Sequence, residues 1–503
     1  MGKALERSTS TGPDLAAPPL DPVAAMLVAG GDARLTLDPL SGQNQYGCPP
    51  TPLAPMFDFA SSTASVISER GYRAADVLWR RLAATHEPPA QVYARELDRM
   101  RGELLALNGL DGFAGLEVAF AASGTDLHLM VAELVGGEPA HPLICVAVEA
   151  EETGSGVPKA LSGRHFSERA ALGADVVAGE AVGAATSAFV SVSARGPDGD
   201  LRDGAIIEAE LDALVLEASQ AGRRVLLTVA DVSKTGLIAP GLAAVMALRR
   251  RFPRTLEVLI DACQFRLTPS TLRAYLKAGM MVAVTGSKFL TGPTFSGALF
   301  VPPAVGQRLR GRLPKPAFGL YAARAEWPAG WVANGALPEA ANLGLLLRWQ
   351  AALDELSAFR ALPESRVAAF LSAFADAIES RLAVDPRLDP VAARPLDRRP
   401  IGAEEGWDAV PTIFPFRLRD QNGVLLSAAA TRTVYQTLRD AGLRLGQPVA
   451  CGVREGVPTA ALRLCASARL VVEALSGFGP GPEGVITHAL WVLDAAAAAA
   501  ASA

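Results

Sequence analysis

Seven short apolar runs lie between residues 116 and 302, and most of them are followed by a loop and a helical pattern. The runs span 116–123, 142–150, 188–194, 224–231, 256–262, 281–287 and 297–302. Runs that are apolar throughout are typical of strands buried on both faces of a parallel sheet. We therefore expect an α/β fold, with a mostly parallel seven-stranded sheet sandwiched by helices. The last run follows its neighbour so closely that we expect an antiparallel pair.

The pattern differs on either side of these runs. Helical periodicity at 65–84 and 90–108 precedes them, and an Asn-Gly pair ends the second helix. After about residue 345, long helical patterns come first and shorter strands follow, which indicates a smaller α+β C-terminal domain. The predicted divisions are an N-terminal arm with helices (1–95), a large domain (96–340), a small domain (341–492) and an Ala-rich tail (493–503).

Composition narrows the class of protein. Half of the 503 residues are apolar, a fifth are charged and the formal net charge is −5, without a long basic run. The sequence therefore lacks the cluster of basic residues that is expected of a nucleic-acid-binding protein. No apolar stretch is long enough to cross a bilayer without charges, and the first residues lack the apolar core of a signal peptide. Five scattered cysteines fit a reducing compartment. We expect a cytoplasmic protein with neither a membrane nor a nucleic acid as partner.

Two candidate chemical groups directly follow predicted strands, where ligands bind in open α/β sheets. Lys288 comes after the run at 281–287. A half-buried lysine can lose its proton and attack carbonyls, although an ion-paired or snorkelling lysine is the alternative. Asp261 ends the run at 256–262 and could hold a protonated ring nitrogen, although a helix cap is the alternative.

A third candidate lies where the first run gives way to a helix. Ser123, Gly124 and Thr125 form a small-residue turn that opens a helical pattern. Free backbone N–H groups and the helix dipole suit a phosphate there, and a plain N-cap is the alternative. Together, an amine, an acid and a phosphate cup are what pyridoxal phosphate requires.

With these residues the chain resembles the fold-type I pyridoxal-phosphate enzymes, especially the class V aminotransferase and cysteine desulfurase branch. Four segments in register carry the resemblance, within residues 115 to 475: Ser123-Gly-Thr-Asp126, "DVSKTGLIAP" (231–240), Asp261-Ala-Cys-Gln264, and Ser287-Lys288 followed by Gly-Pro. The resemblance implies a Schiff base at Lys288 and an Asp261 contact to the pyridine nitrogen. It also implies a Gln264 hydrogen bond to the ring hydroxyl.

The resemblance implies further contacts and a partner. The remaining cofactor-binding residues would be Ser123, Gly124, Thr125, Ser233, Thr285 and Ser287. Arg463 would clamp a substrate carboxylate, because a bidentate arginine suits that task; an edge-strand arginine in solvent is the alternative. Enzymes of this kind are homodimers, so a homodimer is expected. No metal ligand set is expected.

Three departures from the family pattern stand out. Glu152 or Thr153 occupies the place where a histidine commonly stacks on the cofactor ring, with His128 and His165 as possible substitutes. Ala336 stands where the family lends a threonine to the partner's phosphate site. Leu445 falls on the desulfurase nucleophile position, with Cys451 nearby, and an inert buried thiol is the simpler interpretation of that cysteine.

The turn-rich segment 30–52 contains Asn44 and Tyr46, which are candidates for substrate binding, although an ordinary connector would look the same. The resemblance and the motifs lead us to expect a pyridoxal-phosphate enzyme acting on a small amino acid or amine, with aminotransferase activity as the preferred reaction. A lyase, cysteine desulfurase or decarboxylase is the first alternative. A catalytically silent relative is the second.

Overall fold

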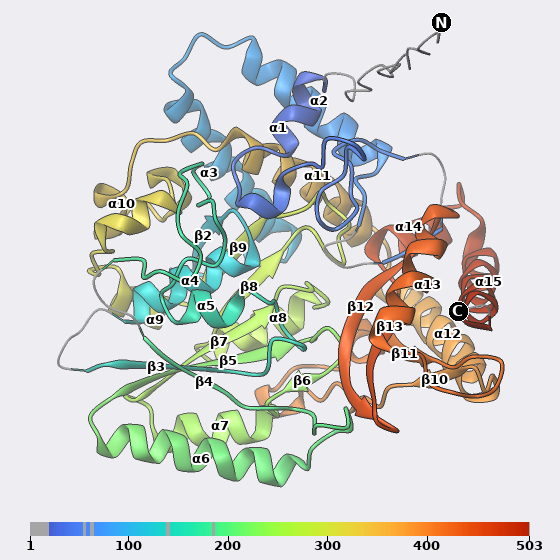
Figure 1. Cartoon of the computed structure of the whole chain (residues 1–503). Coiled ribbons are helices and arrows are strands. Elements are labelled where there is room, and N and C mark those ends of the chain that lie inside the picture. The colour runs from blue at the N-terminus through green and yellow to red at the C-terminus, as the bar shows by residue number, and fades with distance from the viewer. Residues whose placement is uncertain (1–19, 54–56, 61–64, 137–140, 184–186, 502–503) are drawn as a thin grey trace, which may run out of the picture.

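The computed structural model describes residues 20–53, 57–60, 65–136, 141–183 and 187–501 (Figure 1). All seven predicted apolar runs form strands of one central sheet, in the order β2-β9-β8-β7-β5-β3-β4. The strands are β2 (Glu117–Ala121), β3 (Leu143–Ala147), β4 (Ala188–Ser191), β5 (Arg224–Asp231), β7 (Leu256–Ala262), β8 (Met281–Thr285) and β9 (Gly297–Val301). As predicted, β9 pairs antiparallel with β8. A two-residue strand, β6 (Ile238–Ala239), adds an eighth member by pairing with β5.

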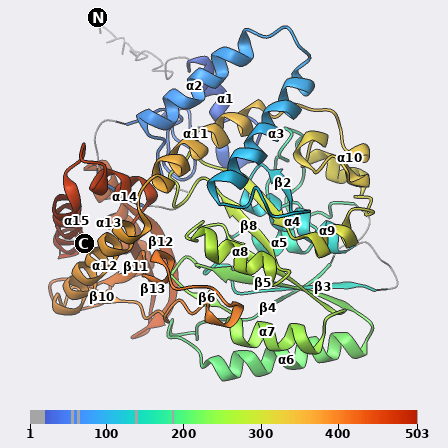
Figure 2. The ribbon, with the colours of Figure 1, turned by 180° about the vertical axis from the view of Figure 1, so that it is seen from behind.

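Helices cover both faces of this sheet, because alternate residues of each strand are apolar on opposite faces. Ala119 and Ala121 of β2 join a core with the helices α4 (Gly124–Val135), α5 (Val157–Leu161) and α9 (Pro303–Leu309). Val118 and Phe120 face a second core, which contains α6 (Gly204–Gln220), α7 (Leu242–Arg251) and α8 (Pro269–Lys277). Figure 2 shows the sheet between these layers from behind. The predicted α/β sandwich is confirmed.

The C-terminal part forms a second, smaller sheet in the order β1-β12-β13-β11-β10. Its strands are β1 (Phe57–Phe59), β10 (Leu388–Pro390), β11 (Ile413–Leu418), β12 (Leu443–Arg454) and β13 (Val457–Cys465). The helices α12 (Glu364–Val384), α13 (Ala428–Asp440), α14 (Ala468–Leu475) and α15 (Gly481–Ala501) pack beside it (Figure 1). The first strand comes from the N-terminal arm and pairs parallel with β12.

The Ala-rich segment differs from its prediction. Residues 493–501 are the last turns of α15 rather than a tail, and Ala496, Ala497 and Ala500 are buried. Alanines suit this place because small side chains let a helix pack closely on its neighbours. By length and composition alone, α15 could also cross a membrane. In this fold its buried residues join the main hydrophobic core.

The N-terminal arm is fixed against α11 (Leu343–Arg360), the long helix that enters the small domain. The arm contains α1 (Pro22–Leu27), α2 (Glu69–Ala83) and α3 (Pro89–Leu107), and the two longer helices agree with the predicted ones. The fully buried guanidinium of Arg348 donates hydrogen bonds to four carbonyl oxygens, those of Leu27, Ala29, Gly30 and Phe295. These contacts attach residues 27–30 to the loop that follows Lys288.

Gly30 shows how close this contact is. Its φ angle is +64°, and an added Cβ would lie 1.7 Å from the side-chain oxygen of Asn342. Glycine is therefore required at this position. The arm then continues through a short 3-10 turn, Ala33–Leu35, beside the central sheet.

Candidate active site

A cavity of about 350 Å³ lies at the carboxyl ends of the central strands. Ten predicted site residues line it: Tyr46, Ser123, Gly124, Thr125, Asp261, Gln264, Thr285, Ser287, Lys288 and Arg463. Parallel strands place the residues that follow them at one edge of a sheet, which explains why separate motifs meet here. Lys288 sits in the turn after β8, and its carbonyl accepts a hydrogen bond from the Thr291 N–H at 2.9 Å.

Asp261 is held as an anion inside this cavity. Its Oδ2 lies 3.3 Å from Nε2 of His128, and the Cys263 N–H donates to its Oδ1 at 3.1 Å. Burial acts to raise the pKa of Asp261, but His128 and the Lys288 ammonium group outweigh burial and hold that pKa well below its usual range. A buried carboxylate that stays ionised suits a contact with a protonated ring nitrogen.

His128 lines the cavity, and protein contacts fix its ring. The ring belongs to α4, where Nδ1 lies 2.7 Å from the Gly124 carbonyl oxygen. Because a carbonyl only accepts hydrogen bonds, Nδ1 must carry the proton. The nitrogen Nε2 faces Asp261 Oδ2, and this contact favours the ionised acid only when Nε2 carries a proton as well. His165 is engaged elsewhere, with its Nδ1 2.6 Å from the Tyr321 hydroxyl.

Gln264 presents an unused acceptor near Asp261. Its Oε1 is buried and, within the part of the chain that the structure describes, has no hydrogen-bond partner. A buried acceptor without a partner costs free energy, so such an atom points to a missing donor. A ligand hydroxyl beside the acid would supply one.

The N-terminus of α4 forms a cup, defined here as Ser123, Gly124 and Thr125. Ser123 caps the helix, and its hydroxyl accepts a hydrogen bond from the Asp126 N–H. An added Cβ on Gly124 would lie 2.9 Å from Cys263 Sγ, so only glycine fits beside this wall. The first helical turn offers backbone N–H groups and the positive end of the dipole, which together suit a phosphate.

Arg34 reaches this cup from the N-terminal arm, a contact that the sequence did not reveal. Its Nη1 lies 3.3 Å from Thr125 Oγ1, and its Nη2 lies 3.4 Å from Ser123 Oγ. Both oxygens of Asp32 accept from the same guanidinium, at 2.8 and 2.6 Å, and the Phe295 ring stacks 4.3 Å from it. The guanidinium is therefore aimed and held beside the cup.

Asp126 adds a carboxyl group to the same region. Burial and the charge of Asp32 raise its pKa to about 7. The Ser123 hydroxyl donates to its Oδ2. An acid that is partly protonated at neutral pH therefore lies beside the cup and the permanent cation Arg34.

A second part of the cavity is cationic. Arg463 of β13 donates from Nε and Nη2 to the Gln447 carbonyl oxygen, at 3.2 and 2.9 Å. Lys234 follows β5 and donates to the Ala150 carbonyl oxygen at 2.8 Å. Burial and the charges of Arg463 and Lys288 lower the pKa of Lys234 to about 8. We call Lys234 and Arg463 the cationic wall.

Two predicted contacts do not reach the cavity. The Ser233 hydroxyl donates to buried Glu152 at 2.6 Å, and Glu152 also pairs with Arg195, so this serine belongs to a network behind the cavity wall. Asn44 is used by its own loop: Oδ1 accepts from the Tyr46 N–H, and Nδ2 donates to Thr294 Oγ1 at 3.2 Å. Neither residue is among those that line the cavity, and each side chain is held by other protein groups.

The desulfurase alternative loses its nucleophile. Gln447 to Ala450 line the cavity, but neighbouring Cys451 is not among the lining residues. It is a buried thiol whose pKa is raised by burial. Leu445 is buried as well. A thiol with a raised pKa is a poor nucleophile, so Cys451 is a structural residue.

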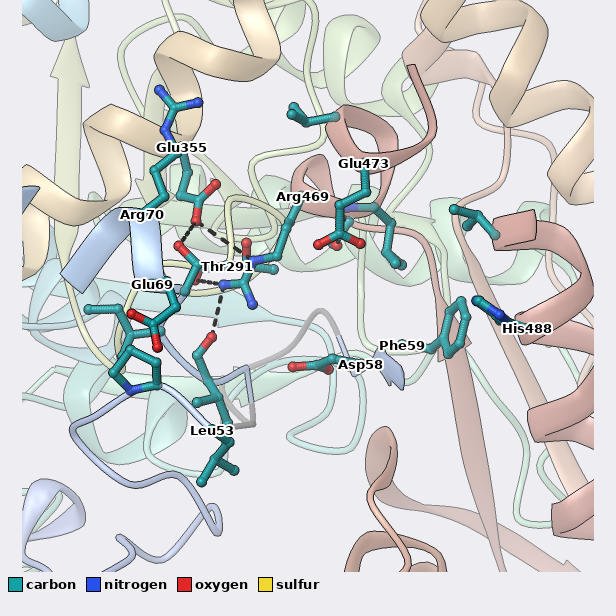
Figure 3. Close-up of a pocket in the computed structure, with 18 of the residues that line it drawn as sticks. Leu53, Asp58, Phe59, Glu69, Arg70, Thr291, Glu355, Arg469, Glu473 and His488 are labelled. Carbon is teal, nitrogen blue, oxygen red and sulfur yellow. Dashed lines mark hydrogen bonds and ion pairs between the residues drawn. The ribbon is translucent and has the colours of Figure 1, made fainter. Parts of the chain in front are cut away.

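A larger cavity, about 710 Å³, lies between the N-terminal arm and α14 and α15. Figure 3 shows that Arg469 lies there between Glu355 and Thr291. Arg469 donates to the Thr291 carbonyl oxygen at 2.9 Å and lies 3.7 Å from Glu355. None of the predicted site residues lines this cavity. Arg469 there stabilises the loop that carries Lys288. Because the predicted site residues line the smaller cavity, we place the site there.

Comparison with known proteins identifies the fold. No family model matches the chain, and no curated protein matches its sequence. A mutant of C-DES with glycine covalently linked to its PLP cofactor aligns at a TM-score of 0.54 and 13% identity, over 88% of this chain and 96% of that one. Mouse CSAD aligns at a TM-score of 0.51 and 13% identity, over 89% of this chain and 84% of that one.

Serine palmitoyltransferase from S. paucimobilis, with a bound PLP-myriocin aldimine, aligns at a TM-score of 0.50 and 13% identity, over 89% of this chain and 88% of that one. Together these likenesses show that the chain has the fold of the fold-type I pyridoxal-phosphate enzymes. The fold that the sequence predicted is confirmed.

Proposed function

We propose that the protein is a pyridoxal-phosphate-dependent enzyme that acts on a small amino acid or amine. One observation carries the proposal: an amine (Lys288), an ionised acid (Asp261) and a phosphate cup line a single cavity at the strand ends. The unused Gln264 Oε1 and the space that only glycine leaves at position 124 support it, because both fit this cofactor. The similar structures contain the same cofactor by name.

Each residue has a task in this proposal. Lys288 anchors the aldehyde, Asp261 keeps the ring nitrogen protonated, and the cup with Arg34 holds the phosphate. Bound pyridoxal phosphate supplies a ring that accepts electrons from the substrate Cα. Lys288 would also take the proton from that carbon and deliver it to another atom as general base and acid. Arg463 orients the substrate through its carboxylate.

Aminotransferase activity is the preferred reaction. If Lys288 delivered the Cα proton to the former aldehyde carbon of the cofactor, hydrolysis by water would release a keto acid and leave the amino group on the cofactor, and this would need no protein residue beyond those named. A lyase is the second candidate, because C-DES is described as a cystine C-S lyase. Product analysis separates the two: transamination requires a keto-acid acceptor and conserves the amine, whereas a lyase requires no acceptor.

The proposal is tested by spectroscopy and by chemical trapping. Purified protein saturated with pyridoxal phosphate should show a visible absorption band that is absent from Lys288→Ala. The exposed lysine variant Lys277→Ala is the matched control and should keep the band. Borohydride reduction followed by peptide mass spectrometry should place the added mass on the Lys288 peptide. A colourless wild-type protein would overturn the proposal and favour a silent relative.

A further inference from the structure

The cationic wall has a property that the proposed reaction does not use. Lys234 and Arg463 come from different domains and line the same cavity as Lys288. Their hydrogen-bond acceptors are neutral carbonyl oxygens, of Ala150 for the lysine and Gln447 for the arginine. Within the described residues, neither side chain forms an ion pair.

The acids near the wall are already engaged or exposed. Glu152 is buried between Arg195, Ser233 and Thr235, so its single charge is shared with Arg195 and only partly offsets the two cations of the wall. Asp261 is held by His128 and lies near Lys288. Glu151 lines the cavity but is exposed, where water screens its charge. The wall therefore carries more positive charge than the protein around it balances.

A buried cation without an anion is costly, and the state of Lys234 reflects this cost. Burial, with the nearby charges of Arg463 and Lys288, lowers its pKa to about 8. An anion bound against Lys234 would favour the charged amine and relieve part of the cost. One substrate carboxylate at Arg463 would leave Lys234 still unbalanced, so a second anionic group is called for.

We infer that the substrate carries two anionic groups, with an α-carboxylate at Arg463 and a second acidic group at Lys234, so that acidic amino acids are its chemical class. The inference rests on the proposed function for the amine that Lys288 exchanges. Binding of the two anionic groups depends only on the residues that line the cavity and not on the proposed reaction. Lys234 is then the residue that determines specificity for the side chain of the substrate.

The test uses probes that have no amine and therefore cannot react. Succinate carries two carboxylates, and butyrate has the same number of carbons but only one carboxylate. Binding of each is measured by isothermal titration calorimetry on the full chain saturated with pyridoxal phosphate. Wild-type protein should bind succinate about tenfold more tightly than butyrate, or better, because a buried charge-assisted contact is of that size.

Variants assign this preference to the wall. Lys234→Met should bring succinate affinity down to that of butyrate and leave butyrate unchanged. Lys234→Arg should keep most of the preference, and the exposed control Lys277→Met should keep all of it. Equal affinity for the two probes in wild type, or an unchanged ratio in Lys234→Met, would overturn the inference. The wild-type ratio decides even where a variant fails to fold.

The same titration without cofactor separates this inference from the proposed function. A protein that shows no visible band but prefers succinate through Lys234 would lose the enzyme assignment and keep the dianion site. A protein that shows the band but does not distinguish succinate from butyrate would keep the assignment and lose the dianion site. Malonate and glutarate then measure the spacing of the two anions.

Discussion

The phosphate cup and the cationic wall are two parts of one cavity that differ in how their positive charges are balanced. In the cup, both oxygens of Asp32 hold the Arg34 guanidinium, and a titrating carboxyl group, Asp126, lies beside it. In the wall, Lys234 and Arg463 contact only carbonyl oxygens. The cup is therefore balanced by the protein itself, whereas the wall depends on a ligand for its balance.

This difference indicates which contacts are permanent. Internal ion pairs fix a side chain before any ligand arrives, so the cup is preorganised for its anion. Cations that contact only neutral acceptors store an electrostatic cost that a ligand can relieve. A permanent cofactor suits the first arrangement, and a substrate that comes and goes suits the second.

The largest expected effect comes from breaking the support of the cup. Arg348→Met removes the four hydrogen bonds that fix the N-terminal arm and leaves buried carbonyl oxygens without donors. We expect the free energy of unfolding to fall by about 3–5 kcal/mol, measured by urea denaturation. Arg80→Met, at an exposed ion pair on α2, should change it by less than about 0.5 kcal/mol. Equal losses in the two variants would contradict this account.

The cup itself is tested by Arg34→Gln. Loss of the guanidinium should weaken pyridoxal phosphate binding by about tenfold to a hundredfold, because a charge-assisted contact to the phosphate disappears. Pyridoxal, which lacks the phosphate, should bind wild type and variant equally. Fluorescence titration measures both dissociation constants. If both ligands weaken together, Arg34 acts on the whole site and not on the phosphate.

Asp126→Asn tests the titrating acid of the cup by its pH dependence. The pKa of Asp126 is raised from 3.8 to about 7, so its contribution to stability is complete below pH 4 and is lost as the pH rises to 7. Between pH 5 and 8, cofactor-free wild type should lose roughly 2–3 kcal/mol more than the variant. Denaturant unfolding at both pH values measures the loss. Asp111→Asn, at an exposed site, should behave as wild type.

The smallest effect sharpens the comparison at the wall. The pKa of Lys234 is lowered from 10.5 to about 8, so its contribution to stability is present above pH 10.5 and lost as the pH falls through 8. At pH 7 without ligand, Lys234→Met should therefore be more stable than wild type by about 1–2 kcal/mol. Thermal unfolding measures the gain. A variant less stable than wild type at pH 7 would show that the charged Lys234 amine does not destabilise the ligand-free protein.

Much of the fold was predictable because its signals are local. Each central strand is one apolar run bounded by turns; Asp261 lies at the end of such a strand, and Gln264 and Lys288 follow strands closely. Parallel strand order then brings them together without further information. The homodimer and the cytoplasmic location stay predictions.

Arg34 could not be found in this way. Its partners in the cup lie about ninety residues further along the chain, and no motif around it marks an anion contact. Ser233 and Asn44 show a different limit: both lie in promising motifs, but the sequence does not show that protein groups already hold their side chains. Alanines 496, 497 and 500 carry no periodic signal, yet their small size lets α15 pack closely.

The pairing of β1 with β12 has a consequence for synthesis on the ribosome. Phe57 and Leu443 stand opposite each other in this ladder, so the strand from the arm has no partner until most of the chain has emerged. The central sheet needs no residue beyond β9 and can form earlier. Arg34 is carried by the same arm, so we expect the cofactor cup to be completed late, after translation of the small domain.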